Sequence, residues 1–228
     1  MARTVWLFDL DNTLHDAGSQ VFGALNRSMG EFVMRELRLD EAESNALRHR
    51  YWQRYGATML GLHRHHGIRP AHFLEDTHRL PGLEAQVEGH RHDFVALQRL
   101  RGRKYILTNA PRSYALRVLR ALGIERLFDG VLAIEDMVCF GQWRPKPDAR
   151  MLRCIAARLR VDPSRCVLVE DTLQHQKSAC RIGMRTVWMQ RYARANPYGG
   201  HWERWSKRPA YVHRVVRTLR PLLRMAHG

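Results

Sequence analysis

The second half of the chain alternates short apolar runs, which are typical of strands, with longer segments of helical pattern. A first apolar run, residues 5–10, precedes this alternation. Strands are predicted over residues 105–109, 129–134, 166–171 and 185–190, and helices over 112–122, 147–160 and 173–182. Strands that alternate with helices form right-handed crossovers, and these build a parallel sheet with helices on its faces. The sequence therefore predicts an α/β fold.

A helical segment separates the first strand from the others. Helices are predicted from about residue 22 to 37, over 41–55 and 58–66, and from Pro70 onward, and glycines 56 and 67 end two of them. Pro81-Gly82 breaks the pattern, and no clear strand falls between residues 16 and 90. We therefore expect a core of residues 1–15 and 91–228, with a small all-helical insertion of residues 16–90.

The end of the chain carries less pattern. Residues 191–208 are rich in Arg, Trp, Gly and Asn and are predicted to form a loop. The segment from Tyr211 to Met225 is predicted to be a final helix.

The first strand ends in two carboxylates, Asp9 and Asp11, followed by Asn12 and Thr13. A buried strand should not end in paired acids unless something neutralises them. A divalent cation would do so, and it would leave one carboxylate ready to act as a nucleophile toward phosphorus. The other interpretation is a polar turn, because Asp, Asn and Thr are ordinary turn residues.

Three later segments also bring polar groups to the ends of apolar runs. The first ends in Thr108-Asn109, the second is a proline-flanked turn that carries Lys146, and the third ends in Glu170-Asp171. Phosphoryl transfer needs a cation, donors for the phosphoryl oxygens and a proton for the leaving group. Ligands of parallel sheets bind at the carboxyl ends of strands, where most of these residues are predicted to lie.

In order and in residue type, these four segments resemble the four motifs of the haloacid dehalogenase superfamily of phosphohydrolases. The resemblance runs from residue 5 to about residue 190. It implies a Rossmann-like parallel sheet core flanked by helices and an inserted, mobile helical cap. It also implies an Mg²⁺-dependent phosphomonoester hydrolase that acts on small phosphorylated metabolites.

The resemblance assigns a role to each motif residue. Asp9 matches the nucleophile that forms an aspartyl-phosphate intermediate, and Asp11 matches the general acid/base. Thr108 matches the hydroxyl that binds the phosphoryl group, and Lys146 matches the lysine that balances charge on nucleophile and phosphate. Asp171 matches the acidic Mg²⁺ ligand, beside the Asp9 carboxylate and the backbone carbonyl of Asp11.

Within the superfamily, the chain is most similar to pyrimidine 5′-nucleotidases. The similarity lies in Asn12-Thr13-Leu14-His15, in Leu107-Thr108-Asn109-Ala110, and in Tyr51-Trp52-x-x-Tyr55-Gly56 of the predicted cap. It implies a pyrimidine nucleoside 5′-monophosphate such as UMP or CMP as substrate, with Asn109 and Tyr55 among its contacts. Cap aromatic residues can stack on a base, although such residues more often pack in a core.

Two positions depart from the common motif. Glu170 stands where a glycine is usual, and His175 stands where a second acid is frequent. A histidine there could bond a metal-bound water or orient Asp171, or it could be a polar residue at a helix N-terminus. Asp11 argues against carbon–halogen cleavage, because the departure of halide needs no protonation.

Several alternatives stay open at this point. One is a phosphatase for another small ester, such as phosphoglycolate or a sugar phosphate, and another is a phosphomutase. A non-enzymatic alternative is a basic nucleic-acid-binding scaffold, because 38 Lys and Arg against 22 Asp and Glu give a net charge of +16. No zinc-finger, RRM or basic-zipper pattern accompanies that charge, so no specific nucleic-acid partner is expected.

The remaining features indicate an ordinary intracellular protein. The four cysteines form no CxxC pair and are expected to be reduced thiols. The apolar run after Thr4 stops at Asp9, which is too short for a signal peptide or a membrane span. We expect a cytoplasmic location without membrane attachment, as a monomer or a dimer.

Overall fold

The computed structural model describes residues 4–192 and 208–225. The chain divides into two compact units, one of residues 1–19 with 87–228 and one of residues 20–86. The sequence predicted divisions at 15/16 and 90/91. The first unit is the core unit, and the second is the helical unit.

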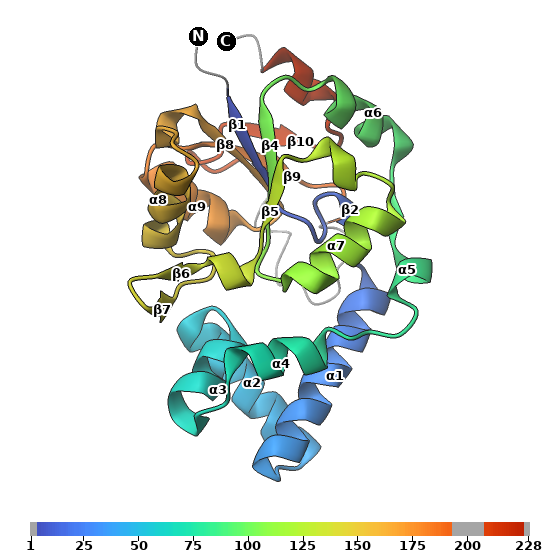
Figure 1. Ribbon diagram of the computed structural model, residues 1–228, viewed down its shortest axis with the longest axis vertical. Coiled ribbons are helices and arrows are strands. Elements are labelled where there is room, and N and C mark those ends of the chain that lie inside the picture. Colours follow the sequence, from blue (N-terminus) through green and yellow to red (C-terminus); the bar gives the residue numbers. More distant parts are fainter. Residues whose placement is uncertain (1–3, 193–207, 226–228) are drawn as a thin grey trace. The chain divides into compact units, whose positions relative to one another are not determined.

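The core unit is built on a six-stranded sheet in which every paired strand is parallel (Figure 1). Its order is β10-β9-β8-β1-β4-β5. The strands are β1 (Val5–Phe8), β4 (Arg103–Leu107), β5 (Gly130–Leu132), β8 (Cys166–Glu170), β9 (Arg185–Met189) and β10 (Arg214–Val216). The predicted α/β class with a parallel sheet is confirmed.

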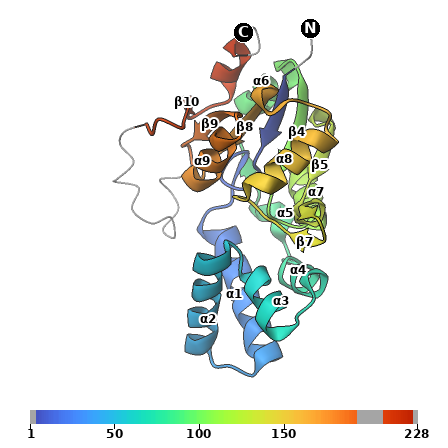
Figure 2. The same ribbon diagram turned by 90° about the vertical axis from the view of Figure 1, so that its left-hand side faces the viewer.

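Helices cover both faces of this sheet. In Figure 1, α8 (Ala149–Arg158) and α9 (Leu173–Arg181) lie on one face, and α6 (Arg91–Arg99) and α7 (Arg112–Ala121) lie on the other. Figure 2 looks onto the face that α8 and α9 cover. The sequence predicted α7, α8 and α9 within two residues at each end and missed α6.

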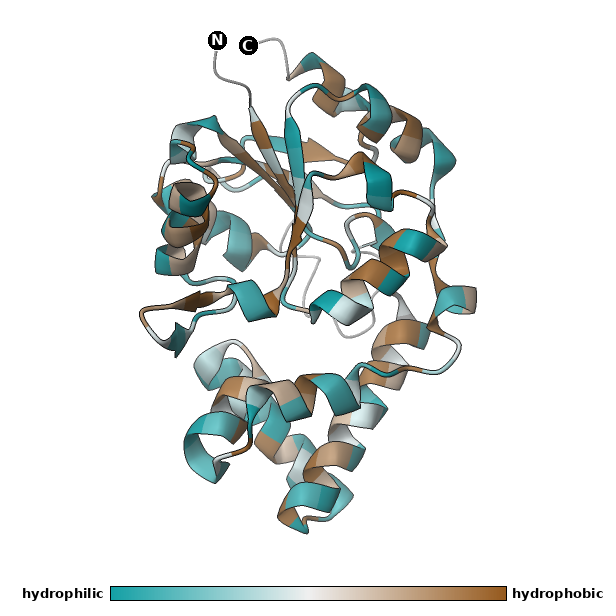
Figure 3. Cartoon of the chain, viewed as in Figure 1, coloured by the Kyte–Doolittle hydropathy of each residue, from teal (hydrophilic) through white to brown (hydrophobic). Residues whose placement is uncertain are grey.

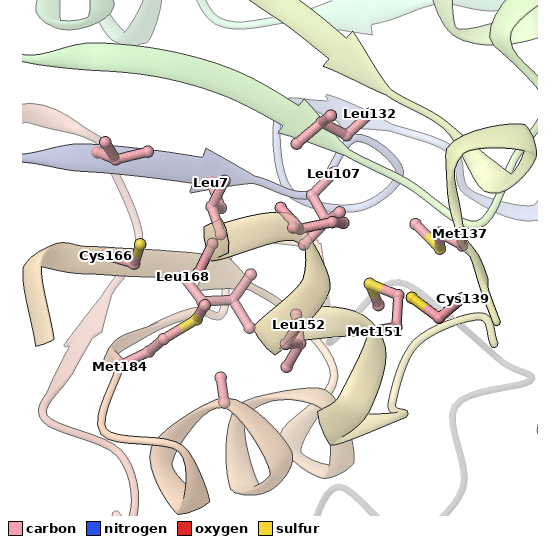
Figure 4. Close-up of a cluster of buried hydrophobic side chains, with 14 residues drawn as sticks. Leu7, Leu107, Leu132, Met137, Cys139, Met151, Leu152, Cys166, Leu168 and Met184 are labelled. Atoms are coloured by element: carbon pink, nitrogen blue, oxygen red, sulfur yellow. The ribbon is translucent and has the colours of Figure 1, made fainter. Parts of the chain in front are cut away.

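The core between the sheet and α8 explains why these segments fold as they do. Leu7, Leu107 and Leu168 project from three neighbouring strands and meet Met151 and Leu152 of α8 (Figure 4). Along α8 the buried positions recur at helical spacing, so one face of the helix is apolar. Strand β4 changes from hydrophilic to hydrophobic along its length (Figure 3), and only its end is buried.

The strand register brings the motif residues to one edge of the sheet. Phe8 of β1 pairs with Ile106 of β4 on one side and with Val169 of β8 on the other. Asp9 follows at once, and its backbone N–H donates to the Val169 carbonyl over 2.9 Å. Asp9 therefore lies between the carboxyl ends of β4 and β8, where such sheets bind ligands.

Some expectations for the core unit were wrong. The segment 211–225 is not one helix, because β10 joins the sheet beside β9 and a 3₁₀ helix follows over Arg220–Arg224. Residues 16–90 were expected to contain no clear strand, but β2 (His15–Asp16) pairs antiparallel with β3 (Glu88–Gly89) at the two ends of this segment. A second short pair, β6 (Val138–Cys139) with β7 (Gln142–Trp143), was also missed. Strands of two residues are too short to show alternation.

The helical unit follows the sequence closely. Its helices are α1 (Ser19–Leu37), α2 (Glu41–Tyr55), α3 (Thr58–His66), α4 (Pro70–Thr77) and α5 (Leu83–Gln86). Gly56 and Gly67 end α2 and α3 with φ of 78° and 67°, a conformation that glycine adopts without a Cβ clash. Asp40 caps α2 and forms a capping box with Glu43.

Three smaller expectations remain. Cysteines 139, 154, 166 and 180 are all free thiols. The predicted loop over 191–208 lies outside the described residues except at its two ends. Within the described part of the chain, every helix is too short or too polar to cross a membrane.

Candidate functional site

A buried lysine stands at the centre of the candidate site. The Lys146 Nζ atom lies 2.6 Å from Asp9 Oδ1 and 2.8 Å from Glu170 Oε2. Lys146, Asp9 and Glu170 are almost fully buried, with 2%, 6% and 1% of the residue surface exposed. Burial alone would lower the pKa of Lys146, but the two carboxylates outweigh it and hold that pKa above its usual value. Lys146 therefore stays charged.

Asp171 adds a third carboxylate. Oxygen atoms of Asp9, Glu170 and Asp171 lie within 4.8 Å of one another. Burial, followed by the neighbouring Glu170 carboxylate, raises the pKa of Asp9 to about 7 and that of Asp171 well above its usual value. Burial also opposes ionisation of Glu170, yet Lys146 and then His175 hold the pKa of this carboxyl below its usual range. Glu170 is thus the carboxylate that remains ionised beside the lysine.

This donor set fits a hard divalent cation. Three carboxylates against the one charge of Lys146 leave a surplus of two negative charges when all are ionised. Clustered oxygen ligands of this kind suit Mg²⁺, which is bound through one or two carboxylates together with water and substrate phosphate.

Asp11 faces a different set of partners from Asp9. Its Oδ1 accepts a hydrogen bond of 2.6 Å from the Tyr114 hydroxyl and lies 2.9 Å from His15 Nε2. Thr13, two residues on, donates its hydroxyl to Asp9 Oδ2 over 3.3 Å. The two aspartates of the first motif are therefore held by separate groups. Asp9 contacts the charged Lys146, and Asp11 contacts the neutral hydroxyl of Tyr114.

The second motif contributes two residues, Thr108 and Asn109, which make different contacts. Thr108 is buried just beyond β4, and its hydroxyl oxygen accepts a hydrogen bond from the Ala110 backbone N–H. The Asn109 amide is used on both sides by the backbone of Lys146, donating to its carbonyl over 3.0 Å and accepting from its N–H over 2.8 Å. Asn109 was expected to contact substrate, but its observed contacts fix the position of the lysine.

The fourth motif contains the residue whose importance the sequence concealed. Glu170 received no role from the sequence beyond its place at a strand end and its departure from glycine, and it is the second partner of Lys146. The signal that could have found it is its place at the end of an apolar run next to Asp171, where an unpaired acid would be costly. His175 lies with Nδ1 3.1 Å from Glu170 Oε2, so it faces Glu170.

Tyr55 belongs to the helical unit, apart from the core-unit residues above. Its hydroxyl and His65 Nε2 share a hydrogen bond of 2.6 Å. The guanidinium carbons of Arg54 and Arg64 lie 5.4 Å and 5.9 Å from the centre of its ring. Trp52, one turn away on α2, is 59% exposed, so it is not a core residue. Tyr51 is buried, as its core interpretation predicts.

Comparison with known families agrees with the fold. The model of the haloacid dehalogenase-like hydrolases matches residues 4–179, which include all four motifs. The chain belongs to this family.

Two individual relatives have low sequence identity to this chain. Phosphate metabolism protein 8 of Saccharomyces cerevisiae is 27% identical over 204 residues, 82% of this chain and 61% of that protein. Validoxylamine A 7′-phosphate phosphatase of Streptomyces hygroscopicus subsp. limoneus is 30% identical over 110 residues, 47% of this chain and 49% of that protein. The matches thus span 61% and 49% of the length of these two curated relatives.

Among solved structures, CbbY from Rhodobacter sphaeroides in complex with phosphate has a similar fold. Its TM-score is 0.64 at 20% identity, with 96% of each chain covered.

Proposed function

We propose that this protein is an Mg²⁺-dependent phosphomonoester hydrolase that works through an aspartyl phosphate on Asp9. One observation carries the proposal: a buried lysine bonded to Asp9 and Glu170, with Asp171 completing a carboxylate cluster. Burying charged groups costs free energy, so a buried charge cluster of this kind supports a functional role. A nucleophile held by a permanent cation, beside acids that can receive a second one, is what phosphoryl transfer requires.

The chemistry proceeds in two steps. In the first, an oxygen of the Asp9 carboxylate attacks phosphorus, and the bond from phosphorus to the ester oxygen breaks. The electron pair of that bond goes to the ester oxygen, which takes a proton from Asp11. In the second, Asp11 takes a proton from water as the water oxygen attacks phosphorus, and the Asp9 carboxylate is released.

The other residues bind and orient. Lys146 favours the ionised form of Asp9 and offers positive charge to the phosphoryl oxygens, while Thr108 offers its hydroxyl to them. Asp9, Asp171 and the backbone carbonyl of Asp11 would hold Mg²⁺, which when bound supplies positive charge against the phosphoryl oxygens. Thr13, through its hydrogen bond to Asp9 Oδ2, orients the nucleophile.

For the substrate, we propose a pyrimidine nucleoside 5′-monophosphate such as UMP or CMP. Trp52 and Tyr55 of α2 offer aromatic surface, and Arg54 and Arg64 supply positive charge beside it. Such a cluster suits a stacked base. A different small phosphate ester is the second candidate, favoured by the name of the relative that acts on validoxylamine A 7′-phosphate.

The test is a screen of nucleotides, sugar phosphates and phosphoglycolate with released phosphate as the readout, with Mg²⁺ and with a chelator. We expect turnover of at least one ester that is lost with chelator and lost in Asp9→Asn. Asp162→Asn is the matched control, because Asp162 is exposed and only caps a 3₁₀ turn. Turnover that survives in Asp9→Asn would exclude the proposed nucleophile.

A second comparison tests the substrate class. Tyr55→Ala should raise KM for the nucleotide about tenfold, since stacking on one aromatic ring contributes roughly 1–3 kcal/mol. The same variant should leave hydrolysis of 4-nitrophenyl phosphate unchanged. If the screen finds only sugar phosphates as substrates, or if KM for the nucleotide does not change, the nucleotide proposal is wrong while the phosphatase proposal stands.

A further inference from the structure

Asp11 is held by two buried side chains from separate parts of the core unit. Tyr114 of α7 is 2% exposed and donates its hydroxyl to Asp11 Oδ1 over 2.6 Å. His15 of β2 has no exposed surface, and its Nε2 lies 2.9 Å from the same oxygen. Both contacts therefore meet at one oxygen of the carboxyl group.

The direction of these hydrogen bonds follows from the surroundings. Among the residues that the structure describes, none forms a hydrogen bond with the buried His15 Nδ1. A buried N–H without a partner costs more than a buried lone pair, so the ring proton belongs on Nε2, where it is donated to Asp11. Burial and then the Asp11 carboxylate raise the pKa of Tyr114 well above its usual value, so the hydroxyl keeps its proton. Both residues are donors to Oδ1.

We propose that Tyr114 and His15 are positioning residues that determine which oxygen of Asp11 transfers the proton. The inference rests on the proposed phosphatase function, in which Asp11 is the general acid. An oxygen that accepts two hydrogen bonds has both lone-pair directions in use, so the transferable proton resides on Oδ2. The two donors also fix the plane of the carboxyl group and thus the direction in which Oδ2 points.

The proton transfer then balances as follows. When the bond between phosphorus and the ester oxygen breaks, its electron pair goes to that oxygen, which takes the proton from Oδ2. Asp11 is left as a carboxylate whose charge is stabilised at Oδ1 by the Tyr114 hydroxyl and the His15 ring N–H. In the second step the same carboxylate takes a proton from water at Oδ2. Neither donor gains or loses a proton.

The experiment measures kcat/KM for a series of phosphate esters whose leaving groups range from 4-nitrophenol to simple alcohols. Tyr114→Phe removes one donor and little volume. We expect a loss of about tenfold for alkyl phosphates and less than about twofold for 4-nitrophenyl phosphate, because a good leaving group departs without protonation. Tyr105→Phe is the matched control, since Tyr105 packs against the core cluster of β4 and α8. It should leave the whole series unchanged.

A second pair of variants separates positioning from packing. His15→Gln keeps an amide N–H within reach of Asp11 and should retain most activity, whereas His15→Leu should repeat the leaving-group dependence of Tyr114→Phe. A loss that is equal for all leaving groups in Tyr114→Phe or in His15→Leu overturns the inference while the phosphatase function stands. A wild-type protein that hydrolyses none of the esters overturns the proposed function, and the inference with it.

Discussion

The core unit and the helical unit use charge in opposite ways. In the core unit, Lys146 is buried with two carboxylates at 2.6 Å and 2.8 Å, and backbone contacts to Asn109 fix its position. In the helical unit, Arg79 pairs with Glu75 at 2.8 Å, but the two side chains are 73% and 71% exposed. The distances are alike and the surroundings are not. Burial determines whether an ion pair strongly affects its surroundings or contributes little at an exposed surface.

The largest effect should come from the nucleophile. Asp9→Asn should lower kcat roughly 10⁴-fold or more, as loss of a catalytic nucleophile does in other enzymes. The fold should persist, because Lys146 keeps Glu170 as a partner. Phosphate release and thermal unfolding, measured on the same preparation, check both parts. A variant with near-normal turnover would contradict the assignment of Asp9.

Removal of the buried lysine should destabilise the core unit. Lys146→Met leaves Asp9 and Glu170 without their cation, and removal of one partner from a buried ion pair costs about 3–5 kcal/mol. Urea unfolding in the presence of a chelator measures the change in the free energy of unfolding. Addition of Mg²⁺ should recover part of the loss. A change below about 1 kcal/mol would mean that the carboxylates do not depend on the lysine.

Divalent-ion affinity should depend on pH with a definite sign. Burial raises the pKa of Asp9 to about 7 and that of Asp171 well above its usual value, so without an ion these acids carry protons under acidic conditions. Binding of Mg²⁺ must displace those protons. Affinity should therefore fall as pH decreases below about 7, by about tenfold per pH unit for each proton released. Calorimetric titration between pH 5 and pH 8 tests this, and a flat profile would contradict it.

The smallest effect belongs to the exposed pair of the helical unit. Arg79→Met should change the free energy of unfolding by less than about 0.5 kcal/mol, because exposed ion pairs contribute little. It replaces a paired cation with methionine, as Lys146→Met does, so the comparison of the two variants tests the effect of burial. Equal losses in the two variants would refute the contrast between the units.

Much of this architecture could be predicted from the sequence because local chemistry determined it. Gly56 and Gly67 end their helices where a left-handed residue is needed. The motif residues Asp9 and Asp171 stand at strand ends because apolar runs stop there, and a parallel sheet gathers such ends at one edge.

What could not be predicted depends on contacts that are distant in sequence. The pairing of Glu170 with Lys146 joins side chains that are 24 positions apart in the sequence, which no local pattern reveals. The final segment was misread because its apolar residues repeat at helical spacing. Pro221 should have argued against a helix there, and Val215 and Val216 favour the edge strand that β10 forms.

Asn109 and Tyr55 mark the limit of the site predictions. The Asn109 amide was expected to contact substrate, which stays a prediction, and the structure adds that both of its polar atoms bind the backbone of Lys146. Tyr55 is surrounded by Arg54, Arg64 and His65, a setting that its sequence position alone did not indicate. Side-chain contacts at such positions depend on three-dimensional neighbours, whereas the place of the acids at strand ends follows from the local sequence.

The central claim is that Asp9 becomes covalently phosphorylated, and chemical trapping tests it directly. The enzyme is mixed with a substrate found in the screen and Mg²⁺, quenched in acid, and reduced with borohydride, which converts an aspartyl phosphate into homoserine. Peptide mapping by mass spectrometry should find homoserine at position 9 and unmodified aspartate at positions 11 and 171. Turnover with no homoserine at position 9, or with homoserine at another aspartate, would contradict the account.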